Sequence, residues 1–228
     1  MLALLLFLSL AQADDRPKYA PWVERLSRSH EYLRTHEAPD YWKLIPYYQG
    51  GPCGPASMTM VLNAMRESQD LKASDRLITQ EDLGSKIKIF IEGSDPGIKG
   101  MSLDGFGRVL ARALKNFGLE GWSFEVVRAE KTDAFRKKVH ELLAANEKSA
   151  SDFVVPLFLQ KDFTGDPEGA IGHYAPVAAY DGKRVLVLDP DREWYEPYWI
   201  PEEVFLDGIT DPKADSIKPG GYIRIFRK

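Results

Sequence analysis

The sequence contains a single cysteine, Cys53, and it stands where a thiol can be activated. The chain from this residue reads C-G-P-A-S-M-T-M-V-L-N-A-M, with apolar side chains at helical spacing, and Pro55 suits the first turn of a helix. The N–H groups and the dipole of a helix N-terminus stabilise a thiolate, which is the nucleophilic form of cysteine. Cys53 is therefore a candidate nucleophile, with a small buried hydrophobic residue as the alternative interpretation.

A nucleophilic thiol needs a base, and His173 is the histidine best placed to be one. The other three histidines, His30, His36 and His140, fall in polar helical stretches that are typical of solvated surface residues. His173 instead opens the apolar run H-Y-A-P-V-A-A-Y, which predicts a strand. Taken alone, its position favours a histidine of the core or its rim.

The turn that follows this strand brings a carboxylate toward His173. Asp181-Gly182 is a strong hairpin signal, and the return strand R-V-L-V-L ends at Asp189. A carboxylate at the end of an apolar strand is costly to bury without a partner. The chain order Cys53, His173, Asp189 therefore predicts a papain-like triad, although Asp189 could also be a simple turn residue before a proline.

Acyl transfer also needs hydrogen-bond donors for the oxyanion that forms at the attacked carbonyl. The backbone N–H of Cys53 is one candidate, because it lies at the helix start. The side-chain amide of Gln49 is a second candidate, and an ordinary loop glutamine is an equal alternative.

The remaining pattern predicts the elements that must hold these residues. We expect helices over 21–34, from Cys53 onward, and over 79–86, 102–116 and 132–145, with loops at 41–51 and 92–100. We expect strands over 153–159, 174–180, 185–188 and 222–226, and Pro156 favours an edge or a bulge in the first of them. Helices followed by an antiparallel sheet indicate an α+β fold with two lobes in one domain.

Composition narrows the function classes. The 228 residues include 44% hydrophobic and 28% charged residues, and the net charge is −4, with a pI near 5.7. These values are ordinary for a soluble globular protein, and they exclude the basic surface that binding to nucleic acid requires. One cysteine and four scattered histidines form no metal-ligand cluster, which argues against a non-catalytic metal-binding or thiol-binding module.

The N-terminus predicts export to the periplasm or the medium. An apolar run from Leu2 to Leu10 is followed by Ala11-Gln12-Ala13, which is typical of a signal peptide over residues 1–13 and is too short for a membrane span. The mature domain would then cover 14–228, without stable membrane insertion. A misassigned start or an apolar terminus is the alternative, since a basic segment before the run is missing. A single cysteine cannot form an internal disulfide, so in an exported chain it points to chemistry.

Three blocks of the sequence together resemble the catalytic domain of the phytochelatin synthase family. They are C-G-P-A-S-M-T-M-V-L-N-A-M, G-H-Y-A-P-V-A-A-Y and V-L-V-L-D-P-D-R-E-W-Y-E-P-Y-W, in the order of the family, and G-I-K-G-M-S-L-D-G-F is similar to a further segment of it. The resemblance runs from Tyr41 to the C-terminus. It implies a papain-like fold with Cys53, His173 and Asp189 as triad, and it places Gly172 and Arg192 at the substrate.

The resemblance also implies a reaction. The thiol would attack the Cys–Gly bond of glutathione, release glycine, and pass the γ-glutamylcysteinyl group to water or to a second glutathione. The family's Cys-rich C-terminal region is absent, as in bacterial members that tend toward hydrolysis. No tightly bound cofactor is implied, because cadmium or zinc would enter as thiolate complexes of the substrate.

Four positions depart from the family pattern. The family's oxyanion glutamine lies six residues before the nucleophile, a place that Tyr47 holds here, whereas Gln49 lies four before it. Pro156 and Gly220 replace residues that would contact substrate. A papain-like peptidase that acts on ordinary peptides, similar to double-glycine peptidases, is therefore the alternative function. The sequence leaves monomer and homodimer both open.

Overall fold

The computed structural model describes residues 19–69, 71–72, 74–87 and 101–228. In this part of the chain the strands form two four-stranded antiparallel sheets with the orders β1-β7-β6-β5 and β2-β8-β3-β4. The strands are β1 (Glu24–Arg25), β2 (Trp122–Arg128), β3 (Asp152–Leu159), β4 (Gly172–Tyr174), β5 (Val177–Tyr180), β6 (Arg184–Val187), β7 (Tyr198–Pro201) and β8 (Gly221–Arg227). The α-helices are α1 (Glu31–Thr35), α2 (Pro39–Leu44), α3 (Cys53–Met65), α4 (Gln80–Ile87), α5 (Leu103–Asn116), α6 (Asp133–Ser149), α7 (Gln160–Thr164) and α8 (Glu202–Thr210). The predicted α+β class is confirmed.

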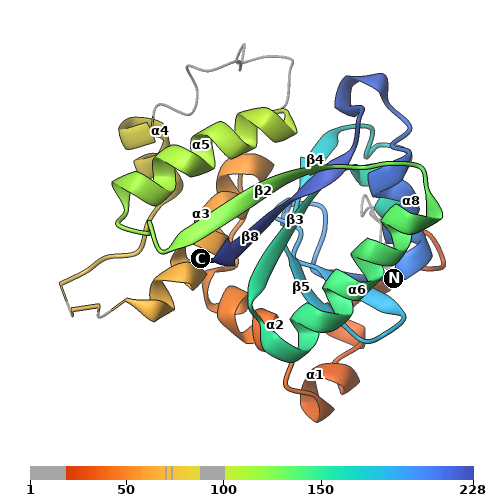
Figure 1. Ribbon diagram of the computed structural model, residues 1–228. Helices are drawn as coiled ribbons and strands as arrows, with labels where there is room; N and C mark the ends of the chain where they lie inside the picture. Colours follow the sequence, from red (N-terminus) through yellow and green to blue (C-terminus); the bar gives the residue numbers. More distant parts are fainter. Residues whose placement is uncertain (1–18, 70, 73, 88–100) are drawn as a thin grey trace, which may run out of the picture.

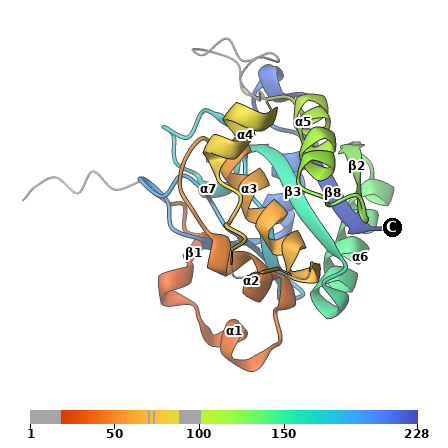
Figure 2. The same cartoon turned by 90° about the vertical axis from the view of Figure 1, so that its left-hand side faces the viewer.

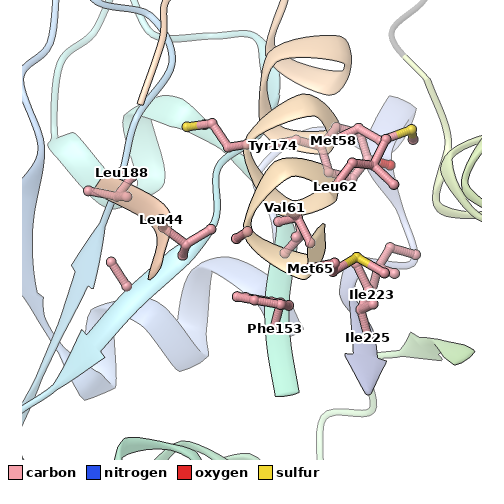
Figure 3. Packing of buried hydrophobic residues seen from close by; sticks show 14 of the residues in the cluster. Leu44, Met58, Val61, Leu62, Met65, Phe153, Tyr174, Leu188, Ile223 and Ile225 are labelled. Atoms are coloured by element: carbon pink, nitrogen blue, oxygen red, sulfur yellow. The ribbon is translucent and has the colours of Figure 1, made fainter. Parts of the chain in front are cut away.

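Helix α3 is the central element of the fold. Every residue from Gly54 to Met65 is buried, because α4 and α5 pack on one side of the helix and α2 packs on another (Figures 1 and 2). Its apolar side chains meet Phe153 of β3 and Ile223 and Ile225 of β8, as Figure 3 shows. A helix that is apolar on all faces has to be buried in this way, and its N-terminus is thereby fixed against the sheets.

A polar residue of α3 also holds the segment that follows it. Asn63 donates through Nδ2 to the carbonyl of Ile78 at 2.9 Å and accepts from the Ile78 N–H at the same distance. The next helix, α4, then begins with the predicted capping pattern: the Asp82 N–H donates to Thr79 Oγ1 at 3.2 Å, and the Thr79 N–H donates to Asp82 Oδ2 at 2.9 Å. The start of α4 is therefore fixed relative to α3.

Several predicted elements are confirmed and others are wrong. The helices α3, α4, α5 and α6, the hairpin β5–β6 and the last strand β8 form as predicted, although α6 continues to Ser149. The helix expected over 21–34 is wrong: β1 pairs with β7, a short 3₁₀ turn over Leu26–Arg28 follows it, and only α1, from Glu31, is α-helical. The loop expected over 41–51 is helical up to Tyr47, because Pro39 and Pro46 lie in first helical turns, where a missing N–H costs nothing.

The strand expected over 174–180 is two strands in different sheets. Its first residue, Tyr174, ends β4, and Ala175-Pro176 carries the chain across to β5 in the other sheet. The prediction that Pro156 marks an edge strand is wrong for β3 as a whole, since β3 pairs with both β8 and β4. Pairing with β4 starts only at Leu157, so at Pro156 itself the strand has one neighbour, and the missing N–H is tolerated.

The loop expected over 92–100 lies outside the described residues, and so does the N-terminal segment 1–13. No helix in the described ranges has both the length and the apolar composition that crossing a membrane requires.

Candidate active site

The cysteine occupies the first position of α3, as predicted. Pro52 precedes it as the N-cap residue and has no side-chain acceptor, so no side chain caps this helix start. The Cys53 thiol is partly buried and is not in a disulfide. The N–H groups at the start of α3 are therefore available to an anion at or beside the sulfur.

The open edge of β4 receives this helix start. β4 is the outer strand of its sheet, so the N–H and C=O groups on one side of it lack a strand partner. The backbone N–H of Tyr174 donates to the Cys53 sulfur, and the carbonyl of Tyr174 accepts from Ser57 Oγ at 2.9 Å. Ser57 lies one helical turn after Cys53 and so shares its face of α3. One strand residue therefore fixes both the thiol and the turn that carries it.

His173, the residue before Tyr174, faces the sulfur from the same strand. Its Nε2 is 2.7 Å from Asp189 Oδ1, and the other side of the ring forms a hydrogen bond with the thiol of Cys53. The side chains of His173 and Asp189 are buried. The hairpin produces this meeting as predicted, because the Leu188 N–H still donates to the carbonyl of Pro176 at 3.0 Å, which leaves Asp189 just beyond the last rung of the ladder.

Asp189 is held by more donors than the sequence pattern predicts. Its Oδ1 also accepts from the N–H of Asp191 at 2.9 Å, and its Oδ2 accepts from Tyr198 Oη at 3.1 Å. The hydroxyl of Tyr48 donates to the backbone carbonyl of Asp189 at 2.7 Å. One feature of the sequence could have indicated these additional donors. An ionised carboxylate has about four acceptor positions, so a carboxylate predicted to be buried needs several donors from neighbouring elements.

These contacts set the charges of the site. Burial alone would raise the pKa of the Cys53 thiol, but the hydrogen bond and charge of His173 and the Tyr174 N–H outweigh it, and the pKa lies below the usual value. Burial alone would lower the pKa of His173, but the charge and hydrogen bond of Asp189 raise it well above the ordinary range. Burial opposes the charge of Asp189 too, yet His173 and the other donors bring the pKa of this carboxyl below its usual value. All three shifts act in the same sense: each favours the charged form of its group, the thiolate, the imidazolium and the carboxylate, relative to the same group in water.

Gln49 lies in the short segment between Tyr47 and α3. Its Oε1 accepts from Gln80 Nε2 of α4 at 2.8 Å. Among the described residues, its own Nε2 has no hydrogen-bond partner. Sequence reasoning did not identify Gln80, since nothing in the sequence indicates that α4 starts beside this segment.

The two residues that the resemblance placed at the substrate lie on either side of the triad. Gly172 opens β4, and a Cβ on it would lie 2.6 Å from the side chain of Ile217, so a larger residue here would have to displace that side chain. The exposed Arg192 places its guanidinium 5.0 Å from the ring centroid of Tyr48, which is within the range of a cation–π contact. Arg192 thus fastens the segment before α3 to the turn after Asp189.

The residues that the structure describes include no group of three or more side chains placed to hold a metal ion. What the site does hold is a thiol at a helix N-terminus, an imidazole that can take and return a proton, and a carboxylate that fixes the imidazole ring. This set of groups suits attack on a carbonyl carbon, formation of a thioester and expulsion of an amine.

Comparison with known proteins agrees with this arrangement. The model of the phytochelatin synthase family matches residues 27–222. Glutathione gamma-glutamylcysteinyltransferase 3 from Lotus japonicus is 26% identical over 199 residues, which are 80% of this chain and 37% of the relative. Glutathione gamma-glutamylcysteinyltransferase 2 from Arabidopsis thaliana is 25% identical over 208 residues, or 87% of this chain and 42% of the relative.

The chain thus spans about two-fifths of the length of these curated relatives. Among solved structures, the Pseudomonas avirulence protein AvrPphB aligns with 78% of this chain and 90% of its own, at a TM-score of 0.35 and 11% identity, which is too low to assign a fold. The family model covers most of the chain and includes all three residues of the site. The chain therefore belongs to the phytochelatin synthase family.

Proposed function

We propose that this protein cleaves glutathione through an acyl-enzyme on Cys53. The observation that carries the proposal is the contact of the Cys53 thiol with an imidazole that Asp189 holds at 2.7 Å, in a chain of the phytochelatin synthase family. The curated relatives are named for transfer of the γ-glutamylcysteinyl group of glutathione. The proposed substrate follows from these names, and the proposed chemistry follows from the site.

The reaction proceeds in two steps. The Cys53 sulfur attacks the carbonyl carbon of the Cys–Gly peptide bond, and the His173 imidazolium gives its proton to the departing glycine nitrogen. A thioester between Cys53 and γ-glutamylcysteine remains. His173, now neutral, takes a proton from water or from a second glutathione, whose attack on the thioester releases the product and restores the thiolate. Asp189 keeps the imidazole in orientation throughout and exchanges no proton.

Water is the proposed main acceptor, because two positions where the family pattern has substrate-contacting groups offer none here. Pro156 has no polar side chain, and it is buried in β3. At Gly220 a Cβ would overlap the backbone carbonyl of Ile209 in α8, so no longer side chain fits without a shift of that helix. Each lost contact to a charged group weakens binding of an acceptor by about 1.5 to 3 kcal/mol. Attack by water needs no such pocket.

Metal ions enter this proposal as part of the substrate. Cadmium or zinc would arrive as thiolate complexes of glutathione, and the protein needs no tightly bound cofactor for the chemistry above. With water as the main acceptor, added metal is expected to yield little phytochelatin.

The test is incubation with millimolar glutathione, with and without cadmium, followed by chromatography of the thiol products and mass spectrometry of the protein. We expect γ-glutamylcysteine and glycine, and a mass increase on the wild-type protein that is absent from a Cys53→Ser variant. Abundant metal-stimulated phytochelatin would refute the preference for water. Cleavage of ordinary peptides without release of glycine from glutathione would refute the glutathione proposal in favour of the peptidase alternative.

We also propose that the mature domain, 14–228, acts after export. The support is the apolar run with its Ala11-Gln12-Ala13 ending, which lies outside the described residues. N-terminal sequencing of the protein from cell fractions tests this proposal, and an intact N-terminus in the cytoplasmic fraction would refute it.

A further inference from the structure

Gln80 ties the start of α4 to the segment that leads into Cys53. Its Nε2 donates to Gln49 Oε1 at 2.8 Å and to the carbonyl of Gly50 at 2.9 Å. The Thr79–Asp82 capping pair described above holds the first turn of α4, so the backbone of Gln80 is fixed before its side chain reaches across. A segment three to four residues before the nucleophile is thereby attached to a separate helix.

The contact to Gly50 determines which way both amides face. A backbone carbonyl can only accept, so the group that Gln80 presents to it has to be the nitrogen. The atom of Gln49 that meets the same nitrogen then has to be its oxygen. Nε2 of Gln49 is therefore the free end of this amide. The orientation of both side chains follows from one unambiguous acceptor, although amide ends are otherwise assigned only by inference.

Gly51 leaves the room that this contact needs. Its φ of +140° is a conformation that side-chain-bearing residues rarely adopt, and a Cβ here would lie 2.5 Å from Gln80 Oε1. On the other side of the segment, the Gly51 N–H donates to the carbonyl of Pro190 at 3.2 Å, next to the triad carboxylate. The segment is thus held from both sides.

We propose that Gln80 is a positioning residue that turns the amide nitrogen of Gln49 toward the oxyanion. This inference rests on the proposed function, and it takes the Gln49 amide, which the sequence analysis gave as a candidate, as a donor to the attacked carbonyl oxygen. Gln80 itself has no part in the chemistry, since both contacts of its nitrogen are to the protein. Without it, the Gln49 amide could rotate and present either end to the substrate.

Two substitutions of Gln80 should affect the Gln49 amide in different ways. Gln80→Ala removes the donor and leaves the Gln49 amide free, so we expect kcat for glycine release to fall about tenfold, the effect of one hydrogen bond. Gln80→Glu keeps the size but places an ionised acceptor there, which would draw Gln49 Nε2 toward itself and away from the substrate. Its loss should then approach the roughly hundredfold effect expected for Gln49→Ala. KM should change little in either variant.

The decisive measurement is a double-mutant cycle with Gln49→Ala. If Gln80 acts through Gln49, then Gln80→Ala added to Gln49→Ala should cost less than about twofold. An unreduced loss of about tenfold in that background would overturn the inference, because it would show a role in the general structure of the site. Gln69→Ala is the matched control: Gln69 Nε2 also donates to two acceptors, here the backbone carbonyls of Phe117 and Gly118, away from the triad, and its loss should leave kcat unchanged.

A second substrate separates this inference from the proposed function. Acylation of Cys53 by p-nitrophenyl acetate, measured as the burst of p-nitrophenolate, needs no glutathione site. If the wild type gives the burst and the same coupling between Gln80 and Gln49, but releases no glycine from glutathione, the proposed function fails and the role of Gln80 stands. If glycine is released but the two residues act independently with both substrates, the role of Gln80 fails and the function stands.

Discussion

Replacement of Asp189 by Asn should preserve the catalytic arrangement, whereas replacement by Ala should destroy it. The reason is the N–H of Asp191, which donates at 2.9 Å to Oδ1, the same oxygen that faces His173 Nε2 at 2.7 Å. In the Asp189→Asn variant this fixed donor forces the amide oxygen into the Oδ1 position, and the NH₂ group takes the place of Oδ2. There it meets the Tyr198 hydroxyl, which can accept as well as donate. The histidine therefore keeps its tautomer.

The magnitudes of the two losses differ for this reason. The Asn side chain exchanges a charge-assisted hydrogen bond for a neutral one, about 1 to 1.5 kcal/mol, or roughly a tenfold loss in kcat/KM. The Ala side chain leaves the His173 ring without its acceptor and two further buried donors, the Asp191 N–H and the Tyr198 hydroxyl, unpaired. At about 1 to 3 kcal/mol each, these two donors alone should cost roughly 2 to 6 kcal/mol of unfolding free energy.

The assay is kcat/KM against pH for both variants, together with urea unfolding. Asp189 raises the pKa of His173, so the imidazolium is lost at lower pH in the Asp189→Asn variant, and the alkaline limb of the profile should move toward neutral pH. A loss in Asp189→Asn as large as in Asp189→Ala would refute this reasoning. A loss above about a thousandfold with normal stability would show that the amide is turned the wrong way, since a wrong tautomer costs far more than one weakened hydrogen bond.

Three further results are expected. Iodoacetamide should alkylate Cys53 rapidly at pH values well below the usual thiol pKa of about 8.5, because His173 lowers the thiol pKa, and His173→Ala should remove this low-pH reactivity. Ser57→Ala should leave the fold intact but slow acylation several-fold, since it breaks the 2.9 Å tie between α3 and β4, and an unchanged rate would assign the alignment to packing alone. Burial raises the pKa of Asp40 to about 8, so the folded state holds a proton there that the unfolded state has lost, and stability should fall as pH rises from about 4 to about 8, by up to about 5 kcal/mol. Urea unfolding of the wild type and of an Asp40→Asn variant at pH 5 and pH 9 measures this difference, and identical pH dependence in the two proteins would contradict it.

The meeting of Cys53, His173 and Asp189 could be predicted from the sequence because each of these residues lies where a local pattern ends or begins. Cys53 starts an apolar helix, Asp189 follows an apolar strand, and the turn between β5 and β6 contains Asp181-Gly182, a pair that is typical of hairpin turns. Such signals depend on neighbours a few residues away. The same holds for α5, whose start is capped by Ser102 accepting from the Gly105 N–H at 3.1 Å.

The wrong and missing elements depend on partners far along the chain. β1 has two residues and exists because Glu24 and Arg25 pair with Trp199 and Tyr198 of β7, close to the other end of the sequence. Apolar and polar residues largely alternate in β2, W-S-F-E-V-V-R, so the sequence pattern permits a strand there. Its partner β8, however, is the last strand of the chain. A local pattern cannot decide between a weak helix and a strand when the deciding hydrogen bonds come from such distances.

The position of the site follows from the place of Tyr174 at the end of β4, the outer strand of its sheet. An outer strand with free backbone groups is a hazard in most proteins, because another chain can pair with it. Here the chain leaves the sheet immediately after Tyr174, and the N-terminus of α3 covers the exposed groups instead. The N–H of this residue reaches the sulfur and its carbonyl reaches Ser57. Because His173 is the preceding residue of the same strand, a shift of α3 along β4 that parted the thiol from the imidazole would also have to break the Ser57 bond. The open edge of β4 therefore holds Cys53 beside His173, and the proposed chemistry depends on this placement.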